Sequence, residues 1–153
     1  TTMDYGSILE ERTSPAVLMT AREQYMRQCA RGSPSAGSTF AFAHAMIGSR
    51  NKLDVKEGIV CLEKLLRDDE DRTSKRNYVY YLAVAHARMK QYDVALGYID
   101  VLLEAEGDNQ QAKTLKENIK SAMTHDGLIG AAIVGGGALA LAGLVAIFSM
   151  SRK

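Results

Sequence analysis

Apolar residues recur at spacings of three and four along residues 14–124, which is typical of amphipathic helices and not of strands, whose side chains alternate with period two. The only two prolines, Pro15 and Pro34, both precede position 35, so the rest of this region is free to be helical. The pattern predicts an all-α class, with a short helix or arm over residues 1–13 and helices over about 15–30, 40–50, 54–67, 74–90, 92–105 and 110–124.

Polar residues at the starts of these segments indicate where the helices begin. Ser14 and Pro15 have the order of an N-cap followed by proline at the first helical position. The expected caps of the next three helices are Ser38 or Thr39, then Asp54 with Glu57 three residues later, then Thr73 or Ser74.

The end of the chain has a different pattern, because Leu128–Met150 gives 23 uncharged residues in a row. A helix of this length covers roughly 35 Å, enough to cross a hydrocarbon core of about 30 Å. The sequence therefore predicts a transmembrane helix over 127–150, followed by a short basic tail at 151–153. The residues expected to characterise the anchor are Leu128, Ile133, Gly136, Leu141 and Phe148, and those of the targeting tail are Arg152 and Lys153.

Small residues inside this segment add a second expectation. Ala132, Gly136 and Ala140 repeat every four positions, a pattern that permits close contact between two membrane helices. Self-association through the span is thus one interpretation, and simple tolerance of small residues in an anchor is the other. In either case we expect residues 14–126 to form one helical domain that stays in the cytosol.

Charge and chemistry exclude several classes of function. The chain has 19 basic and 18 acidic side chains, and removing Arg152 and Lys153 leaves the domain close to neutral, unlike most nucleic-acid-binding proteins. Cys29 and Cys61 form no CxxC pair and are expected to be small buried hydrophobes, while the three histidines lack metal-ligand spacing. With no catalytic motif in view, we expect no metal, no cofactor and no enzyme activity.

Two helix pairs in the domain are related to each other. In the second pair, Leu82, Ala83, Tyr92, Ala95, Leu96 and Ile99 fall at the spacing of a tetratricopeptide repeat, with small residues where the two helices cross. In the first pair, Gly58, Ile59, Leu62 and Leu65 take the equivalent positions of the second helix. The expected architecture is an antiparallel six-helix bundle with two tetratricopeptide-like pairs, and a plain helix bundle without repeats is the alternative.

A stripe on the first helix of each pair is too apolar for a solvated surface. It consists of Phe40, Ala43 and Ile47 on one helix and Asn77, Tyr80, Val84 and Ala87 on the other. An exposed apolar groove usually marks a site for a partner. The alternative is that the N-terminal arm covers the stripe as ordinary core, and both hold if the arm competes with a ligand.

Four segments carry a resemblance to the mitochondrial fission 1 protein family: residues 57–66 (EGIVCLEKLL), 78–84 (YVYYLAV), 108–113 (DNQQAK) and 126–136 (DGLIGAAIVGG). The resemblance extends from about residue 14 to the end. Members of that family are six-helix bundles with two tetratricopeptide-like repeats. One departure is Asn51, where animal members commonly have tyrosine.

This resemblance implies an adaptor of the mitochondrial and peroxisomal outer membranes that faces the cytosol, recruits a dynamin-related GTPase or its adaptors, and promotes organelle division. The competing hypothesis is a receptor for chaperones or precursor proteins that clamps a terminal carboxylate. Asn77 and Arg88 are candidates for such a clamp, but the facing Phe40, Ala43 and Ile47 are too apolar for it.

Overall fold

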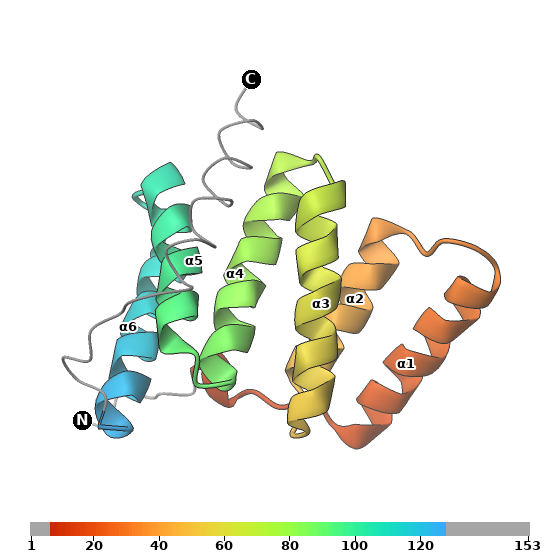
Figure 1. The fold of residues 1–153 in the computed structure, drawn as a ribbon, viewed down its shortest axis with the longest axis horizontal. Coiled ribbons are helices and arrows are strands. Elements are labelled where there is room, and N and C mark those ends of the chain that lie inside the picture. Colours follow the sequence, from red (N-terminus) through yellow and green to blue (C-terminus); the bar gives the residue numbers. More distant parts are fainter. Residues whose placement is uncertain (1–6, 128–153) are drawn as a thin grey trace.

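Six helices and one short 3-10 helix make up the computed structural model, which describes residues 7–127. In chain order they are η1 (Ile8–Glu10), α1 (Pro15–Ala30), α2 (Ala36–Ile47), α3 (Lys52–Asp68), α4 (Arg72–Arg88), α5 (Tyr92–Ala105) and α6 (Gln110–His125). The helices α1 to α6 follow one another across the molecule in sequence order, and each runs roughly antiparallel to the next (Figure 1). The predicted all-α, six-helix architecture is confirmed for the described residues.

The predicted membrane anchor and basic tail lie outside the described residues, apart from Gly127. Among the helices of residues 7–127, none combines the length and the apolar character that crossing a bilayer requires.

Side-chain caps start most of the helices. At α1 the hydroxyl of Ser14 accepts from an amide of the first turn at 3.3 Å, and Pro15 is the first helical residue, as predicted. The start of α2 was predicted wrongly. Its cap is Ser35, whose hydroxyl accepts from the amide of Ser38 at 3.1 Å, so Thr39 lies a turn inside the helix.

Both α3 and α4 also begin earlier than predicted. The side chain of Asn51 caps α3 through a 2.9 Å hydrogen bond from the amide two residues on. Asp54, the predicted cap, lies inside α3, where its carboxylate accepts from the hydroxyl of Ser49 at 2.6 Å. At α4 the cap is Asp71 and not Thr73 or its neighbour. Several polar residues lie close together at each start, and the hydrogen bonds to the first-turn amides identify which one serves as the cap.

The residues predicted at the crossings of the two helix pairs are all buried; they are Gly58, Leu62, Leu82, Ala83, Tyr92, Ala95 and Ile99. Gly58 marks the closest approach of α2 and α3. A Cβ atom there would lie 2.7 Å from Cγ2 of Ile47 and 3.0 Å from the carbonyl oxygen of Ala43. Because such distances are below van der Waals contact, only glycine lets these two backbones pack so closely.

α1 is the least embedded helix, since none of its residues is buried. Tyr25 stacks on Phe42 of α2 with ring centroids 4.2 Å apart. Arg22 reaches past α2 and pairs with Asp54 at 3.2 Å and Glu57 at 3.3 Å, both on α3. These few contacts hold α1 against the pair formed by α2 and α3.

The inner face of α1 contains Leu18, Ala21 and Tyr25, which are half-buried. Cys29, which the sequence pattern predicted to be buried, is exposed near the end of the helix. Cys61 on α3 is half-buried. The prediction that both cysteines are buried hydrophobes is therefore wrong for Cys29, because α1 has a neighbour on one side only.

Candidate partner-binding cleft

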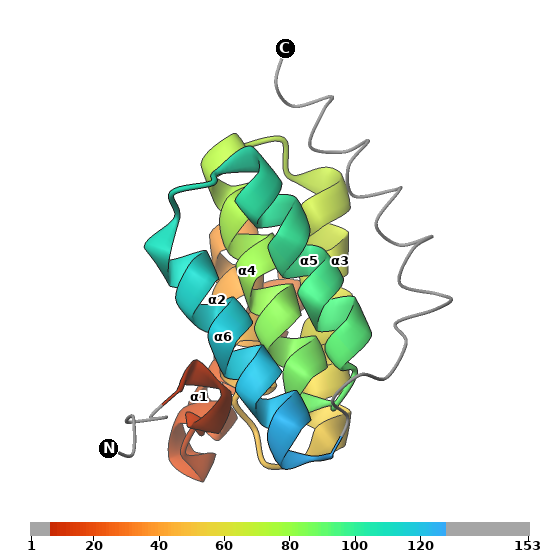
Figure 2. The same ribbon diagram turned by 90° about the vertical axis from the view of Figure 1, so that its left-hand side faces the viewer.

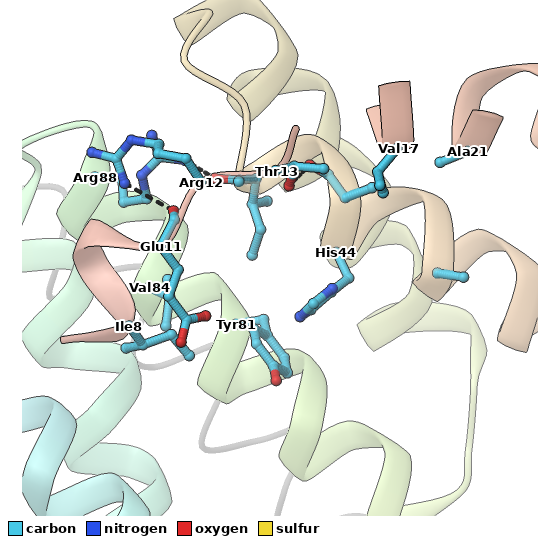
Figure 3. A pocket seen from close by; sticks show the side chains of 14 residues that line it. Ile8, Glu11, Arg12, Thr13, Val17, Ala21, His44, Tyr81, Val84 and Arg88 are labelled. Carbon is cyan, nitrogen blue, oxygen red and sulfur yellow. Dashed lines mark hydrogen bonds between the residues drawn. The ribbon is translucent and has the colours of Figure 1, made fainter. Parts of the chain in front are cut away.

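A cleft of about 380 Å³ lies where the N-terminal arm (residues 7–13) crosses α2 and α4 (Figure 3). Its walls come from four parts of the chain: Ala41, His44, Ala45, Ile47 and Gly48 of and after α2; Tyr81, Val84 and Arg88 of α4; Ile8, Glu11, Arg12 and Thr13 of the arm; and Val17 and Ala21 of α1.

The arm is fastened at its C-terminal end by two hydrogen bonds from Thr13. The Thr13 amide donates to the carbonyl of Gly48 at 2.9 Å, and its hydroxyl donates to the carbonyl of Ala45 at 2.8 Å. At the other end, Ile8 and Leu9 of η1 pack against the main hydrophobic core. The arm thus covers part of the face that α2 and α4 present.

Local hydrogen bonds give the arm its shape. The hydroxyl of Ser7 accepts from the amide of Leu9 at 3.1 Å and so caps η1. The guanidinium of Arg12 folds back on its own segment and donates to the carbonyls of Leu9 at 2.8 Å and Glu11 at 2.9 Å. Because these polar groups form their hydrogen bonds within the arm, the arm binds the helices mainly through Thr13 and through the apolar side chains of Ile8 and Leu9.

Aromatic rings form one wall of the cleft. The exposed ring of His44 meets the half-buried ring of Tyr81 edge-on, with centroids 4.9 Å apart. Phe40 and Tyr80 also pack against Tyr81, at 5.6 and 5.1 Å between centroids. Burial raises the pKa of Tyr81, and the charge of Glu11 raises it further, so its hydroxyl stays a neutral hydrogen-bonding group at neutral pH.

The opposite end of the cleft is cationic, and hydrogen bonds to the backbone hold its arginine in place. Arg88 donates to the carbonyl of Ile47 and, at 2.9 Å, to the carbonyl of Ser49, which ties α4 to the turn between α2 and α3. Burial, together with the smaller effect of the neighbouring charge of Arg12, lowers the pKa of Arg88 to about 10. Two N–H groups of Arg88 already bind backbone carbonyls, and Asn77 is exposed but does not line the cleft. The structure therefore does not bring these two residues together as a carboxylate clamp.

On α4 the predicted stripe is misplaced by one residue. Val84 lines the cleft as predicted, but its companions are Tyr81 and Arg88 and not Tyr80 and Ala87. Tyr80 is only 7% exposed; burial raises its pKa to about 12, and the side chain of Gln111 on α6 lies near enough to oppose that rise. Tyr80 therefore belongs to the packing between α4 and α6, and Ala87 is buried in the core.

The same shift occurs on α2. Ile47 lines the cleft, together with Ala41 and His44, whereas Ala43 is fully buried against α3 and Phe40 is half-buried in the aromatic wall. Moving by one position along a helix rotates the side chain by about 100° around the helix axis. The stripe predicted from the sequence was the more apolar of two neighbouring stripes, and the more apolar stripe is the one that packs into the core. The mixed polarity of positions 81, 84 and 88 on α4 is the signal that would have located the face that lines the cleft.

A second cleft, of about 770 Å³, lies on the other side of the arm. Leu9 and Glu10 of the arm form one wall, and the last two turns of α6, with Lys120 and His125 among the lining residues, form the other together with Asp126. In the view of Figure 2, α6 faces the viewer and the red segment of η1 lies at its lower end. The arm therefore lies between two clefts, one against α2 and α4 and the other against α6.

The side chains that line the cleft are suited to binding a partner. The cleft combines an aromatic wall, aliphatic side chains and fixed guanidinium groups, which suits a peptide segment with apolar anchors. Within residues 7–127, no group of three or more His, Cys, Asp or Glu side chains is placed to hold a metal ion.

The paired antiparallel helices with buried small residues at their crossings define a tetratricopeptide-like helical repeat domain. Sequence profiles specify it further: the Fis1 N-terminal tetratricopeptide repeat matches residues 37–69, and the Fis1 C-terminal tetratricopeptide repeat matches residues 76–128. The chain belongs to the Fis1 family.

Several relatives illustrate the similarity. The chain is 93% identical to the FIS1-related protein fis-2 of Caenorhabditis elegans over 99% of this chain and 100% of that protein. It is 39% identical to the mitochondrial fission 1 protein of Homo sapiens over 95% of both chains. Its fold is similar to yeast Fis1 in a crystal structure with an Mdv1 fragment that contains an N-terminal extension and a coiled coil. That match has a TM-score of 0.68 and 24% identity, and covers 78% of this chain and 92% of the yeast chain.

Proposed function

We propose that this chain is a tail-anchored adaptor of the mitochondrial outer membrane that recruits the fission machinery to the concave face of α2 and α4. The proposal rests on one observation above all, the cleft that these two helices form with the arm. It is also supported by the name of the human relative, a mitochondrial fission 1 protein, and by the yeast Fis1 structure that contains an Mdv1 fragment.

The proposed partner is an adaptor of a dynamin-related GTPase or the GTPase itself. Anchoring the domain confines such a partner to the membrane surface, which raises its local concentration and favours assembly of a constricting polymer. The segment 127–150 supplies the anchor and leaves residues 7–126 on the cytosolic side. The same anchor takes a fraction of the protein to peroxisomes.

The arm regulates access in this proposal. Ile8, Leu9 and Thr13 occupy surface between the two clefts, so a partner segment longer than either cleft must displace the arm. The arm has few attachments, and its displacement has a correspondingly modest free-energy cost.

Imaging of full-length protein with a fluorescent N-terminal fusion tests the proposal. We expect it to surround mitochondria and to fragment them, whereas a version ending at Asp126 is diffuse and inactive. Replacing the exposed cleft residues Ala41 and His44 together by Asp is expected to keep the location and the fold but to abolish fragmentation, because two carboxylates desolvate poorly against an apolar partner.

The matched control replaces Lys113 and Thr114, which are exposed on α6, by Asp. It is expected to fragment mitochondria as the unmodified chain does. Full fragmentation by the Ala41→Asp, His44→Asp variant would refute the cleft as the recruiting surface, and a secretory-membrane location of the unmodified chain would refute the mitochondrial assignment.

A further inference from the structure

Two large apolar side chains on the outer face of α3 are open to solvent. Leu53 is 70% exposed and Val60 is 63% exposed. They lie seven residues apart and therefore on the same side of the helix, two turns from each other. Single exposed apolar residues are ordinary, but a pair aligned along one helix resembles half of a helix–helix seam.

Four cations accompany this pair. Lys52, Lys56, Lys64 and Arg67 are exposed on the same helix, and none of them forms an ion pair with another residue in the described part of the chain. The two acidic residues in the first half of α3 are both engaged by Arg22 of α1. The outer face of α3 is thus an apolar strip with unpaired positive charge beside it.

The other described helices leave this surface open. In Figure 1, α3 lies in front of α2, and no described helix covers its outer side. Next to its start, Met19 of α1 is 62% exposed and lines a shallow cleft of about 450 Å³ with Asn51 and Asp54. Met19 thus adds one exposed apolar side chain beside the start of α3.

We propose that the α3 strip (Lys52, Leu53, Lys56, Val60, Lys64 and Arg67) docks an acidic amphipathic helix of a protein partner. Apolar anchors one heptad apart match the repeat of a helix laid along α3, and the flanking cations complement carboxylates on its polar edges. A second copy of the strip fits poorly, because four cations would face four cations. The site is separate from the cleft between α2 and α4 and does not depend on the proposed function.

The test uses the full chain in nanodiscs of phosphatidylcholine. The probe is a designed helical peptide with Leu at the a and d positions of its heptads and Glu at the flanking positions. A matched peptide with Lys in place of each Glu is the control. We expect saturable binding of the acidic peptide that weakens as salt rises, and no binding of the basic peptide.

Two variants locate the site. Leu53→Ser with Val60→Ser removes the apolar anchors, and Lys56→Glu with Lys64→Glu reverses two charges. The first is expected to weaken binding at least about tenfold, since burying one such apolar side chain alone contributes enough free energy for that factor. The second is expected to weaken binding most at low salt, because it replaces attraction of the acidic peptide by repulsion. Because all four positions are exposed, the thermal unfolding temperature should not change. Arg72→Glu with Lys113→Glu, two exposed cations elsewhere, should bind the peptide normally.

Three outcomes would overturn the proposal. The first is no saturable binding of the acidic peptide, or binding that survives Leu53→Ser with Val60→Ser. The second is that the strip fails to bind the acidic peptide but binds vesicles that contain phosphatidylserine, which would make the strip a lipid-binding surface. The third is a concentration-dependent dimer that the same variants abolish, which would make the strip a contact between copies of this chain.

Discussion

The contact between Gly48 and Thr13 offers a direct way to detach the arm. A Cβ atom on Gly48 would lie 2.2 Å from Oγ1 of Thr13 and 3.2 Å from its backbone nitrogen. Gly48 has φ −86° and ψ −3°, a conformation that alanine adopts without strain. Gly48→Ala therefore leaves the helix end intact and drives Thr13 away from it.

The cost of this displacement follows from the two hydrogen bonds of Thr13. Each contributes about 0.5–1.5 kcal/mol, so the arm loses about 1–3 kcal/mol of attachment. The domain itself should not be destabilised, because replacing glycine at a compatible position stabilises by about 0.4–1 kcal/mol. A loss of 1–3 kcal/mol raises the open population of the arm by roughly 5- to 150-fold.

Hydrogen exchange of the full chain measures this directly. In Gly48→Ala the amide of Thr13 should exchange faster by that factor, while amides in α4 and α5 keep their protection. The control is Gly37→Ala, because a Cβ on Gly37 meets nothing within 4 Å. Unchanged exchange at Thr13 in Gly48→Ala, or equal acceleration in the control, would refute the role of this contact.

Three further variants test the packing. Gly58→Ala should destabilise the domain by about 1–3 kcal/mol in urea unfolding, because its Cβ would overlap α2, whereas Gly37→Ala should not. Arg88→Met should cost about 2–4 kcal/mol, because two carbonyls lose their charged donor, and an unchanged unfolding midpoint would contradict this. Tyr92→Phe should raise the pKa of Asp126 in an NMR titration, because the 2.5 Å hydrogen bond from the tyrosine is the main cause that lowers it. Since the pKa of Asp126 is lower in the folded state, the tyrosine's contribution to stability is present above about pH 4 and disappears as pH falls through the folded pKa. If the free energies of unfolding of the two proteins differed by the same amount at about pH 2 and about pH 7, this account would be wrong.

The sequence was most informative where structure depends on near neighbours in the chain. The predicted bounds of α5, residues 92–105, agree with the structure, and those of α1 and α6 agree to within a residue. Helical periodicity and turn residues are local signals, so they need no knowledge of the rest of the fold. The small residues at the helix crossings, such as Gly58 and Ala95, were also recognisable because the repeat spacing is a property of the chain.

The orientation of each helix about its own axis could not be predicted from local sequence signals. Tyr80 and Tyr81 are adjacent and chemically alike, yet the first packs toward α6 and the second lines the cleft. Likewise Ala43 meets α3 while His44 stays open. Which of two neighbours faces solvent depends on where the adjacent helices lie, and periodicity defines an apolar arc without saying which neighbour covers each part of it.

The arm shows the same division most clearly. Its short helical turn and its polar character are visible in residues 7–13, but nothing local joins Thr13 to Gly48, 35 positions away. That contact exists because the turn after α2 brings a glycine, with no side chain of its own, to the place where the arm crosses. Local residue chemistry therefore sets the helices and offers the residues that can cap them, while the packing of distant segments decides which surface is left open as a site and what covers it.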